Sequence, residues 1–229
     1  MLDASAVKLF KYWNNYNRSG TFVPERVFIG EKIVRVLALF SLLLALAVPA
    51  QAEKDPKVLV KSVADVVLSE ILANKEKLEQ GPSFLMGLVE THMLPIIDEE
   101  RMTMMVLGDQ WKAMNSDQQK SFVEGFKRLM VKTYAGAFKA YNGQEVTYGD
   151  TRFNKTGSKA IVYSAIQMPG GTPVELQYRL YQAKPDTWLV YDANLAGLGV
   201  LKTYRVQFAE QIQRDGLDKT IADLMNIEL

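Results

Sequence analysis

The residues able to do acid–base or metal chemistry are few and scattered. His92 is the single histidine, so no second histidine lies three or four residues away to complete a helical metal pair. No Gly-x-Ser-x-Gly segment is present, which argues against a Ser/His/Asp hydrolase site. Cysteine is absent, which excludes disulfides, thiolate nucleophiles and cysteine-based metal sites. We therefore expect a protein that is not an enzyme, with no catalytic residue, no metal and no cofactor.

Three other motifs are explained better by local structure than by catalysis. Asp98-Glu99-Glu100 supplies carboxylates, but adjacent side chains diverge on a helix, and acidic residues favour its first turn. Gly197-Leu198-Gly199 begins like a dinucleotide fingerprint, yet Lys202 stands where the third glycine belongs and no βαβ pattern surrounds it. Asn154-Lys155-Thr156 matches a glycosylation sequon and a turn equally well.

Large apolar side chains are abundant instead, with 10 Phe, 10 Tyr, 3 Trp and 10 Met. Ser116–Tyr141 has the apolar spacing of one long helix, with Ser116 predicted to cap its first turn and Gln119 to complete a capping box. Its apolar stripe lines either a dry core or a cavity for an apolar ligand, and periodicity does not distinguish the two. Together with two residues just before the helix, the candidate lining is Leu107, Trp111, Phe122, Phe126, Leu129, Met130, Tyr134 and Phe138.

The size and charge of the chain indicate one ordinary globular domain. It has 229 residues, of which 48% are hydrophobic and 23% charged. A formal net charge of +1 gives no strong field to attract nucleic acid, so we expect no nucleic-acid partner.

The N-terminal region predicts export. The uncharged run Val36–Val48 follows Lys32 and Arg35 and is too short to span a bilayer, which needs roughly 20 residues. Ala50 and Ala52 then form the A-x-A pattern of a signal-peptidase site.

These features predict a signal peptide over residues 1–52 and a mature domain over residues 53–229. Met1–Gly30 is longer and more polar than an ordinary n-region. One hypothesis is that translation starts nearer Val27, through a non-Met start codon, and the alternative is a genuine extended n-region.

The mature chain predicts helices, then strands, then helices. Helical spacing covers Val58–Leu78, Ser83–Met93, Glu99–Leu107 and the long helix, with Asp98 placed to cap the third. Four strand-like runs separated by turn residues follow: Glu145–Phe153, Lys159–Met168, Val174–Gln182 and Thr187–Leu195. Helices return from Leu201 and over Leu217–Met225. The predicted fold is α+β, with helices packed over a curved four-stranded antiparallel sheet.

The sheet and the C-terminal helix supply the rest of the candidate lining. In Val174–Gln182, alternate residues are apolar, which is typical of a sheet with one buried face. The residues expected to face the helix stripe are Tyr163, Ile166, Leu176, Tyr178, Leu180 and Val190, with Tyr204 and Phe208 added from the C-terminal helix.

Four segments, taken together, resemble the MlaC-type, or toluene-tolerance, family of periplasmic phospholipid carriers. Their order and spacing across nearly all of the mature chain carry the resemblance, although Gly199 stands where the family usually has a serine. The segments are Asp55-Pro56 with the Val58–Leu72 helix; Met93–Asp98 with Leu107, Gly108 and Trp111; Gln119, Phe122, Phe126 and Leu129 with Thr133-Tyr134; and Trp188, Val190–Asp192, Gly197, Tyr204-Arg205, Gln207-Phe208 and Gly216.

The resemblance implies a cone-like domain with an apolar pocket between the curved sheet and the helices. It implies a protein that buries the acyl chains of a phospholipid and carries it across the periplasm, which maintains outer-membrane lipid asymmetry. The implied partners are an inner-membrane ABC transporter with an MCE-domain ring and an outer-membrane lipoprotein–porin complex. Arg179, Lys202 and Arg205 are the candidates for contact with a headgroup or a partner.

Two alternatives remain open at this point. One is a carrier of the same fold for a hopanoid or another polycyclic or isoprenoid lipid. The other is an enzyme on a cone-shaped α+β scaffold that uses a buried acid and a tyrosine, such as Asp192 with Tyr134, for proton transfer.

Overall fold

A computed structural model describes residues 55–229 and confirms the α+β class. The predicted signal peptide and its cleavage residues Ala50 and Ala52 lie outside the described residues. In chain order the first half consists of α2 (Pro56–Ala73), α3 (Lys75–Gln80), α4 (Ser83–Leu88), the π-helix η2 (Val89–Met93), the 3-10 helix η3 (Leu94–Ile96), α5 (Glu99–Leu107), α6 (Asp109–Ala113) and α7 (Ser116–Ala140). The second half consists of β1 (Val146–Tyr148), β2 (Arg152–Phe153), β3 (Lys159–Ile166), β4 (Val174–Lys184), β5 (Thr187–Leu195), β6 (Leu198–Gly199), α8 (Val200–Asp215) and α9 (Leu217–Met225).

The strands form one antiparallel sheet in the order β1-β3-β4-β5-β6, with β2 also paired to β3. The predicted meander of four strands is present, but the sheet has six strands. The run Glu145–Phe153 divides into β1 and β2 around Gly149, and the short β6 was not predicted. The register pairs Ser164 with Leu176 and Ala160 with Leu180, so these four side chains share one face.

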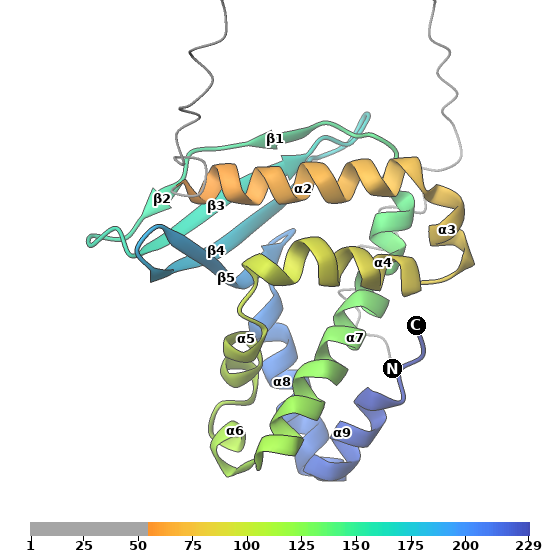
Figure 1. Cartoon of the computed structure of the whole chain (residues 1–229), viewed down its shortest axis with the longest axis vertical. Coiled ribbons are helices and arrows are strands. Elements are labelled where there is room, and N and C mark those ends of the chain that lie inside the picture. The colour runs from red at the N-terminus through yellow and green to blue at the C-terminus, as the bar shows by residue number, and fades with distance from the viewer. Residues whose placement is uncertain (1–54) are drawn as a thin grey trace, which may run out of the picture.

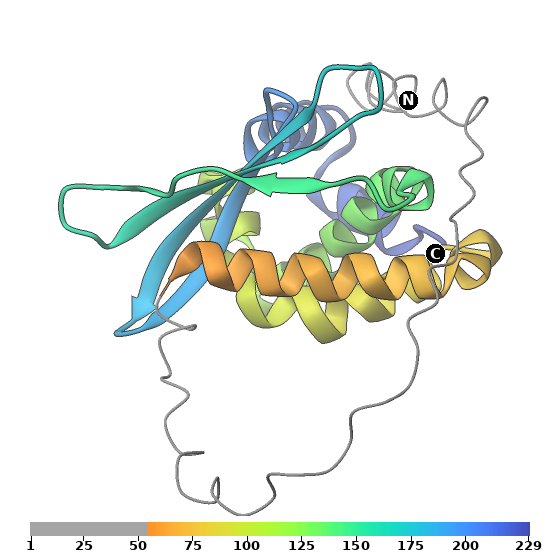
Figure 2. The same ribbon diagram turned by 90° about the horizontal axis from the view of Figure 1, so that it is seen from above.

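One face of the sheet is covered by helix α2 (Figures 1 and 2). Val60 of α2 packs against Ala160 and Val162 of β3 in a buried cluster that includes Leu180. We call this the inner face of the sheet. The segment before α5 also joins the sheet, because Ile97 forms a parallel bridge to Val190 of β5.

Helix α7 links the sheet to a helical lower body (Figure 1). Its N-terminal half packs against α5 and α9, and α8 packs against both of those helices. At Gly125 the chain of α9 approaches so closely that an added Cβ would lie 2.6 Å from Cβ of Leu224. The C-terminal half of α7 rises to α3 and α4, close to the sheet end from which β1 starts.

The predicted cap of α7 is wrong by one residue. Asn115 is the N-cap: its Oδ1 accepts hydrogen bonds from the backbone N of Asp117 (3.0 Å) and Gln118 (2.9 Å). Gln118 returns the bond by accepting from the Asn115 backbone N at 3.0 Å. Asparagine caps at least as well as serine, so the capping box is present but begins one residue earlier than predicted. Gln119 instead donates to the Trp111 carbonyl oxygen at 3.0 Å.

Other helix boundaries follow local chemistry closely. Asp98 caps α5 as predicted, its Oδ1 accepting from the Arg101 backbone N at 2.9 Å. The predicted helix Ser83–Met93 changes to π winding from Val89, ahead of Pro95. The predicted helix Val58–Leu78 is interrupted at Asn74, whose side chain donates to the Glu70 carbonyl oxygen at 2.9 Å. No helix within residues 55–229 is both long and apolar enough to cross a membrane.

Candidate functional site

The lower half of the α7 stripe is solid core. Phe122 and Phe126 meet Tyr204 and Phe208 of α8 in an aromatic quartet whose ring centroids are 4.9 to 5.9 Å apart. Phe122 and Phe208 are 0% and 1% exposed, so no ligand reaches them in this conformation. The quartet lies in a cluster that also holds Leu107 and Trp111, with Leu129 and Met130 packed against it.

The upper half of α7 has different surroundings. Every residue from Thr133 to Ala140 is half-buried: none is fully covered and none is fully exposed. A helix that packs one face on a dense core and turns the other to solvent alternates between buried and exposed positions. The pattern indicates a helix end that is enclosed by the fold without being fully buried, with Phe138 packed against the buried clusters around Ile71 and Leu85. Tyr134 and Phe138 are the large side chains of the stripe in this half.

The inner face of the sheet divides in the same way. At one end Val162, Leu180 and Val190 are fully buried beneath the start of α2. At the other end, nearer the C-terminus of α7, the apolar side chains on the same face are only half-buried although helices cover this face: Val146, Ile166, Val174 and Leu176. Among the described residues α2 packs directly on β3, whereas no strand packs to the same extent against α7.

Half-buried apolar surface is therefore present on two elements that follow one another in the chain, since α7 ends at Ala140 and β1 begins at Val146. We call the six residues concerned the apolar wall: Val146, Ile166, Val174 and Leu176 from the sheet, with Tyr134 and Phe138 from α7. Accessible apolar surface inside a covered sheet is the feature expected of a site for an apolar ligand. Four of the six, Ile166, Leu176, Tyr134 and Phe138, are predicted lining residues, and Tyr178 lies on the same face of the sheet as Ile166 and Leu176.

Four further predicted site residues lie neither in the buried clusters described above nor on the apolar wall. Tyr163 lies on the outer face of the sheet, where the Arg152 guanidinium is 5.3 Å from its ring centroid. Arg179 is on the same outer face, with Nε 3.6 Å from Asp192 Oδ2. Arg205 of α8 donates through Nε to the Met105 carbonyl oxygen at 3.0 Å. Lys202 is exposed in the first turn of α8.

Asp192 is hydrogen-bonded to backbone groups near the start of α8. Its Oδ1 accepts from the backbone N of Ala193 (2.8 Å) and of Leu201 (3.3 Å) at the start of α8. Burial raises the pKa of Asp192, against the opposing effect of these hydrogen bonds and of Arg179. A raised carboxyl pKa is also a mark of catalytic acids, but here both oxygens already serve the fold.

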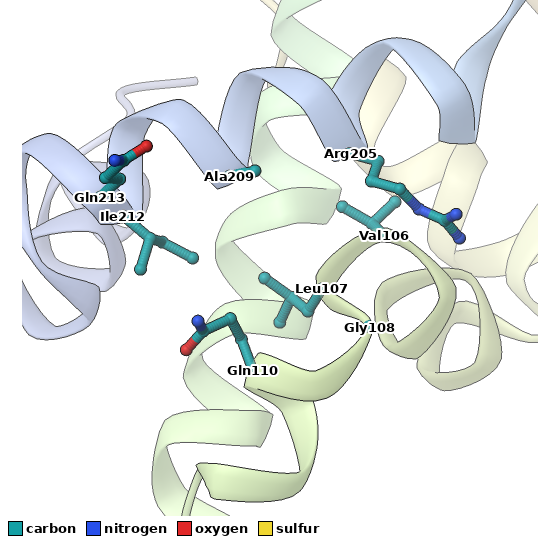
Figure 3. Close-up of a pocket in the computed structure, with 8 residues that line it drawn as sticks. All are labelled: Val106, Leu107, Gly108, Gln110, Arg205, Ala209, Ile212 and Gln213. Carbon is teal, nitrogen blue, oxygen red and sulfur yellow. The ribbon is translucent and has the colours of Figure 1, made fainter.

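A groove of about 600 Å³ lies between the end of α5, α6 and α8 (Figure 3). Leu107 and Ile212 point into it from opposite sides, and Arg205 lies at one end. The groove is separate from the apolar wall, because its lining includes no residue of the sheet or of α7. It brings together Leu107, predicted as lining, and Arg205, predicted as a contact residue.

Polar residues on the inner face are the part of the site that sequence reasoning missed. Tyr148 of β1 and Ser164 of β3 are paired in the register and lie beside Tyr178. Strict alternation along Lys159–Ile166 carries the signal, because it puts Ser164 on the same face as Val162 and puts Tyr163 on the other. Within the described chain no group of His, Cys, Asp or Glu is arranged to hold a metal ion.

Comparison with known proteins identifies relatives over most of the chain. A family model described as MlaC protein matches residues 61–226. The MlaC binding protein of an intermembrane phospholipid transport system in Haemophilus influenzae is 29% identical over 182 residues, covering 76% of this chain and 83% of that protein. The toluene tolerance protein ttg2D of Pseudomonas putida is 27% identical over 186 residues, covering 80% of this chain and 86% of that protein.

A solved structure has the same fold. The phospholipid-binding protein from Ralstonia solanacearum, determined in complex with a phospholipid, superposes with a TM-score of 0.67 at 32% identity. The match covers 74% of this chain and 98% of that one.

Proposed function

The chain belongs to the MlaC family, and on that premise we propose that it is a periplasmic phospholipid carrier that moves lipid between the two membranes of a Gram-negative envelope. The observation that carries the proposal is the half-buried apolar surface on the inner face of the sheet and on the upper half of α7. We propose that acyl chains lie against this apolar wall, and that the aromatic quartet below it is support. Tyr163 is left out of the proposed site because it lies on the outer face.

The energetics of acyl chains explain why such a protein is needed. At roughly 0.8 kcal/mol per CH₂, two chains of about 16 carbons cost on the order of 25 kcal/mol to expose to water. That exceeds the practical ceiling on noncovalent affinity, roughly 18–21 kcal/mol. A carrier therefore need only match the membrane interior, since transfer between two apolar sites changes little net burial. We expect a protein that is loaded at rest and releases lipid when docked.

The finer assignments are also proposals. The docking partners are an inner-membrane ABC transporter with an MCE-domain ring and an outer-membrane lipoprotein–porin complex, reached after export and cleavage following Ala52. Lys202 and Arg205 are proposed as partner contacts, because both are exposed on α8, away from the apolar wall. The protein acts by binding and exchange and not by catalysis, in line with relatives named for binding and transport.

Native mass spectrometry with lipid extraction tests the proposal. Purified wild-type protein is expected to carry about one phospholipid per chain. Leu176→Asp is expected to be purified largely without lipid, because it introduces a charge on the apolar wall. Gln177→Asp, its neighbour on the outer face, is the matched control and should stay loaded. A wild-type protein that arrives empty and accepts no phospholipid from vesicles would refute the carrier. Extraction of a polycyclic lipid instead would reassign the ligand.

A further inference from the structure

Three hydroxyl groups lie in a row across the inner face of the sheet, beside the apolar wall. Tyr148 of β1 pairs with Ser164 of β3, and Tyr178 of β4 lies one pair further along. Ser164 Oγ is 3.5 Å from the Tyr178 hydroxyl, to which it donates a long hydrogen bond. Burial raises the pKa of both tyrosines, so both stay protonated and able to donate at neutral pH. We call these three residues the hydroxyl row.

The Tyr148 hydroxyl is buried and has no hydrogen-bond partner within residues 55–229. The neighbouring Tyr141 does not serve as one, because its own hydroxyl donates to the Gln144 carbonyl oxygen at 3.2 Å. A buried polar group left unpaired is costly, and such groups normally have a partner in the working state of a protein. The hydroxyl row therefore lacks at least one hydrogen-bond acceptor.

The position of the row indicates which acceptor fits. Lys61 Nζ, on the exposed side of α2 and paired with Asp65, lies 5.8 Å from the centroid of the Tyr148 ring. The surface charge of Lys61 thus lies next to the hydroxyl row. The apolar wall begins at Leu176 in the same register row and continues into the next row along the strands. A glycerophospholipid has the same order of chemistry: a charged headgroup, two ester carbonyls, then acyl chains.

We propose that the hydroxyl row, with Tyr148 as its main donor, binds an ester carbonyl of the carried lipid and sets how deeply the chains enter. This inference rests on the proposed function and adds a chemical preference to it. The site selects lipids that present a carbonyl at the junction of headgroup and chains, which are ester-linked lipids. Ether-linked lipids of the same shape lack that acceptor.

The test compares lipids that differ in this group alone. Delipidated protein is offered an equimolar vesicle mixture of dipalmitoyl phosphatidylcholine and its dihexadecyl ether analogue, and native mass spectrometry reads the ratio bound. One hydrogen bond predicts an ester preference of about two- to tenfold. Tyr148→Phe should lower the ratio toward one while total loading persists, and Tyr178→Phe should lower it less. Tyr163→Phe, on the outer face of the same sheet, should keep the wild-type ratio.

Stability of the lipid-free proteins separates a ligand contact from a structural one. Because the Tyr148 hydroxyl has no protein partner, lipid-free Tyr148→Phe should unfold at the wild-type temperature or higher. Equal binding of ester and ether lipids by the wild type, or an unchanged ratio in Tyr148→Phe, would overturn the inference and leave the carrier function intact. Failure of the wild type to bind either lipid would instead count against the carrier itself.

Discussion

Phe126 and Tyr134 lie two turns apart on the same stripe of α7, but their surroundings differ. Phe126 is enclosed by Tyr204 and Phe208. Tyr134 belongs to the half-buried segment beside the sheet. The helix extends beyond the dense core of the lower body. One apolar stripe therefore lies in that core at its N-terminal end and at the proposed binding surface at its C-terminal end.

Because of this contrast, we expect Phe126→Ala to lower the stability of the protein and to leave its lipid binding unchanged. Removing a fully enclosed ring leaves a cavity, and the expected cost is about 3–5 kcal/mol in the free energy of unfolding. Chemical denaturation followed by circular dichroism measures this cost. Lipid per folded chain, read by native mass spectrometry, should match the wild type. If Phe126→Ala keeps the wild-type free energy of unfolding but binds less lipid, Phe126 contacts the ligand and the assignment of the quartet to the core is wrong.

Alternation in the sequence predicts which residues of a strand share a face, but it does not predict which of them line the site. The alternation of Val174, Leu176, Tyr178 and Leu180 predicted their common face correctly. In β3 the predicted lining residue Tyr163 lies on the outer face, and the small Ser164 lies on the inner face. Alternation from Val162 gives this arrangement, and the structure follows alternation.

At the scale of elements, the contact between α7 and α9 depends on Gly125. An alanine Cβ there would meet Leu224 Cβ at 2.6 Å, so the helices must separate. Overpacking of this kind costs roughly 1–3 kcal/mol, and we expect Gly125→Ala to lower the melting temperature by several degrees. Gly87→Ala on α4 is the control: nothing lies within 4 Å of the new Cβ, and alanine favours the helix. Equal melting temperatures for Gly125→Ala and the wild type would mean that α9 shifts away from the added Cβ without a measurable loss of stability.

A group of charged residues joins α5, α7 and η2 and predicts a pH dependence. Burial raises the pKa of Glu99 above 4.5, Lys127 opposes this, and Glu124 and Glu90 add to it. Glu99 Oε2 is buried without a hydrogen-bond partner among residues 55–229. Between the unfolded and the folded pKa, the folded protein holds the extra proton, so this group lowers the free energy of unfolding as pH rises.

Glu99→Gln removes this titration. Lys127 keeps Glu124 at 2.6 Å and Glu90 at 3.4 Å. The variant should gain stability relative to wild type from pH 4.5 to pH 7, measured by urea denaturation at several pH values. Glu100→Gln, at the exposed neighbouring position, should show no such trend. A stability difference that is the same at every pH would rule out Glu99 as the source.

Element boundaries were predictable wherever one local interaction sets them. Asp98 begins α5, and the turn after Lys184 begins β5, at the predicted residues. The π winding of η2 was not predictable, because it depends on how Val89 and Met93 pack against α7 and α2. The interruption at Asn74 accompanies a local hydrogen bond from its side chain to the Glu70 carbonyl oxygen, which helical spacing alone does not reveal. The cap of α7 moved by one residue because Asn115 and Ser116 are both good caps, and sequence alone does not rank them in context.

At the scale of the whole molecule, the fold combines a rigid and a loose half. The lower body, the helices around the aromatic quartet, is densely packed. In the upper half α2 covers the sheet, and the apolar wall remains half-buried. A carrier benefits from this division, since one half holds the fold while the other admits and releases a chain.

The division predicts where lipid protects the backbone. Hydrogen–deuterium exchange of loaded and delipidated protein should differ at Thr133–Ala140, at η2 and at β1, because the ligand supports the apolar wall from inside. Amides of Phe122–Phe126 and of α8 should exchange equally in both forms, because their packing does not involve lipid. This internal comparison needs no variant and is read from one sample in two states. Protection spread evenly over both halves would show that lipid stabilises the fold globally, and the loose upper half would then not be the place where it binds.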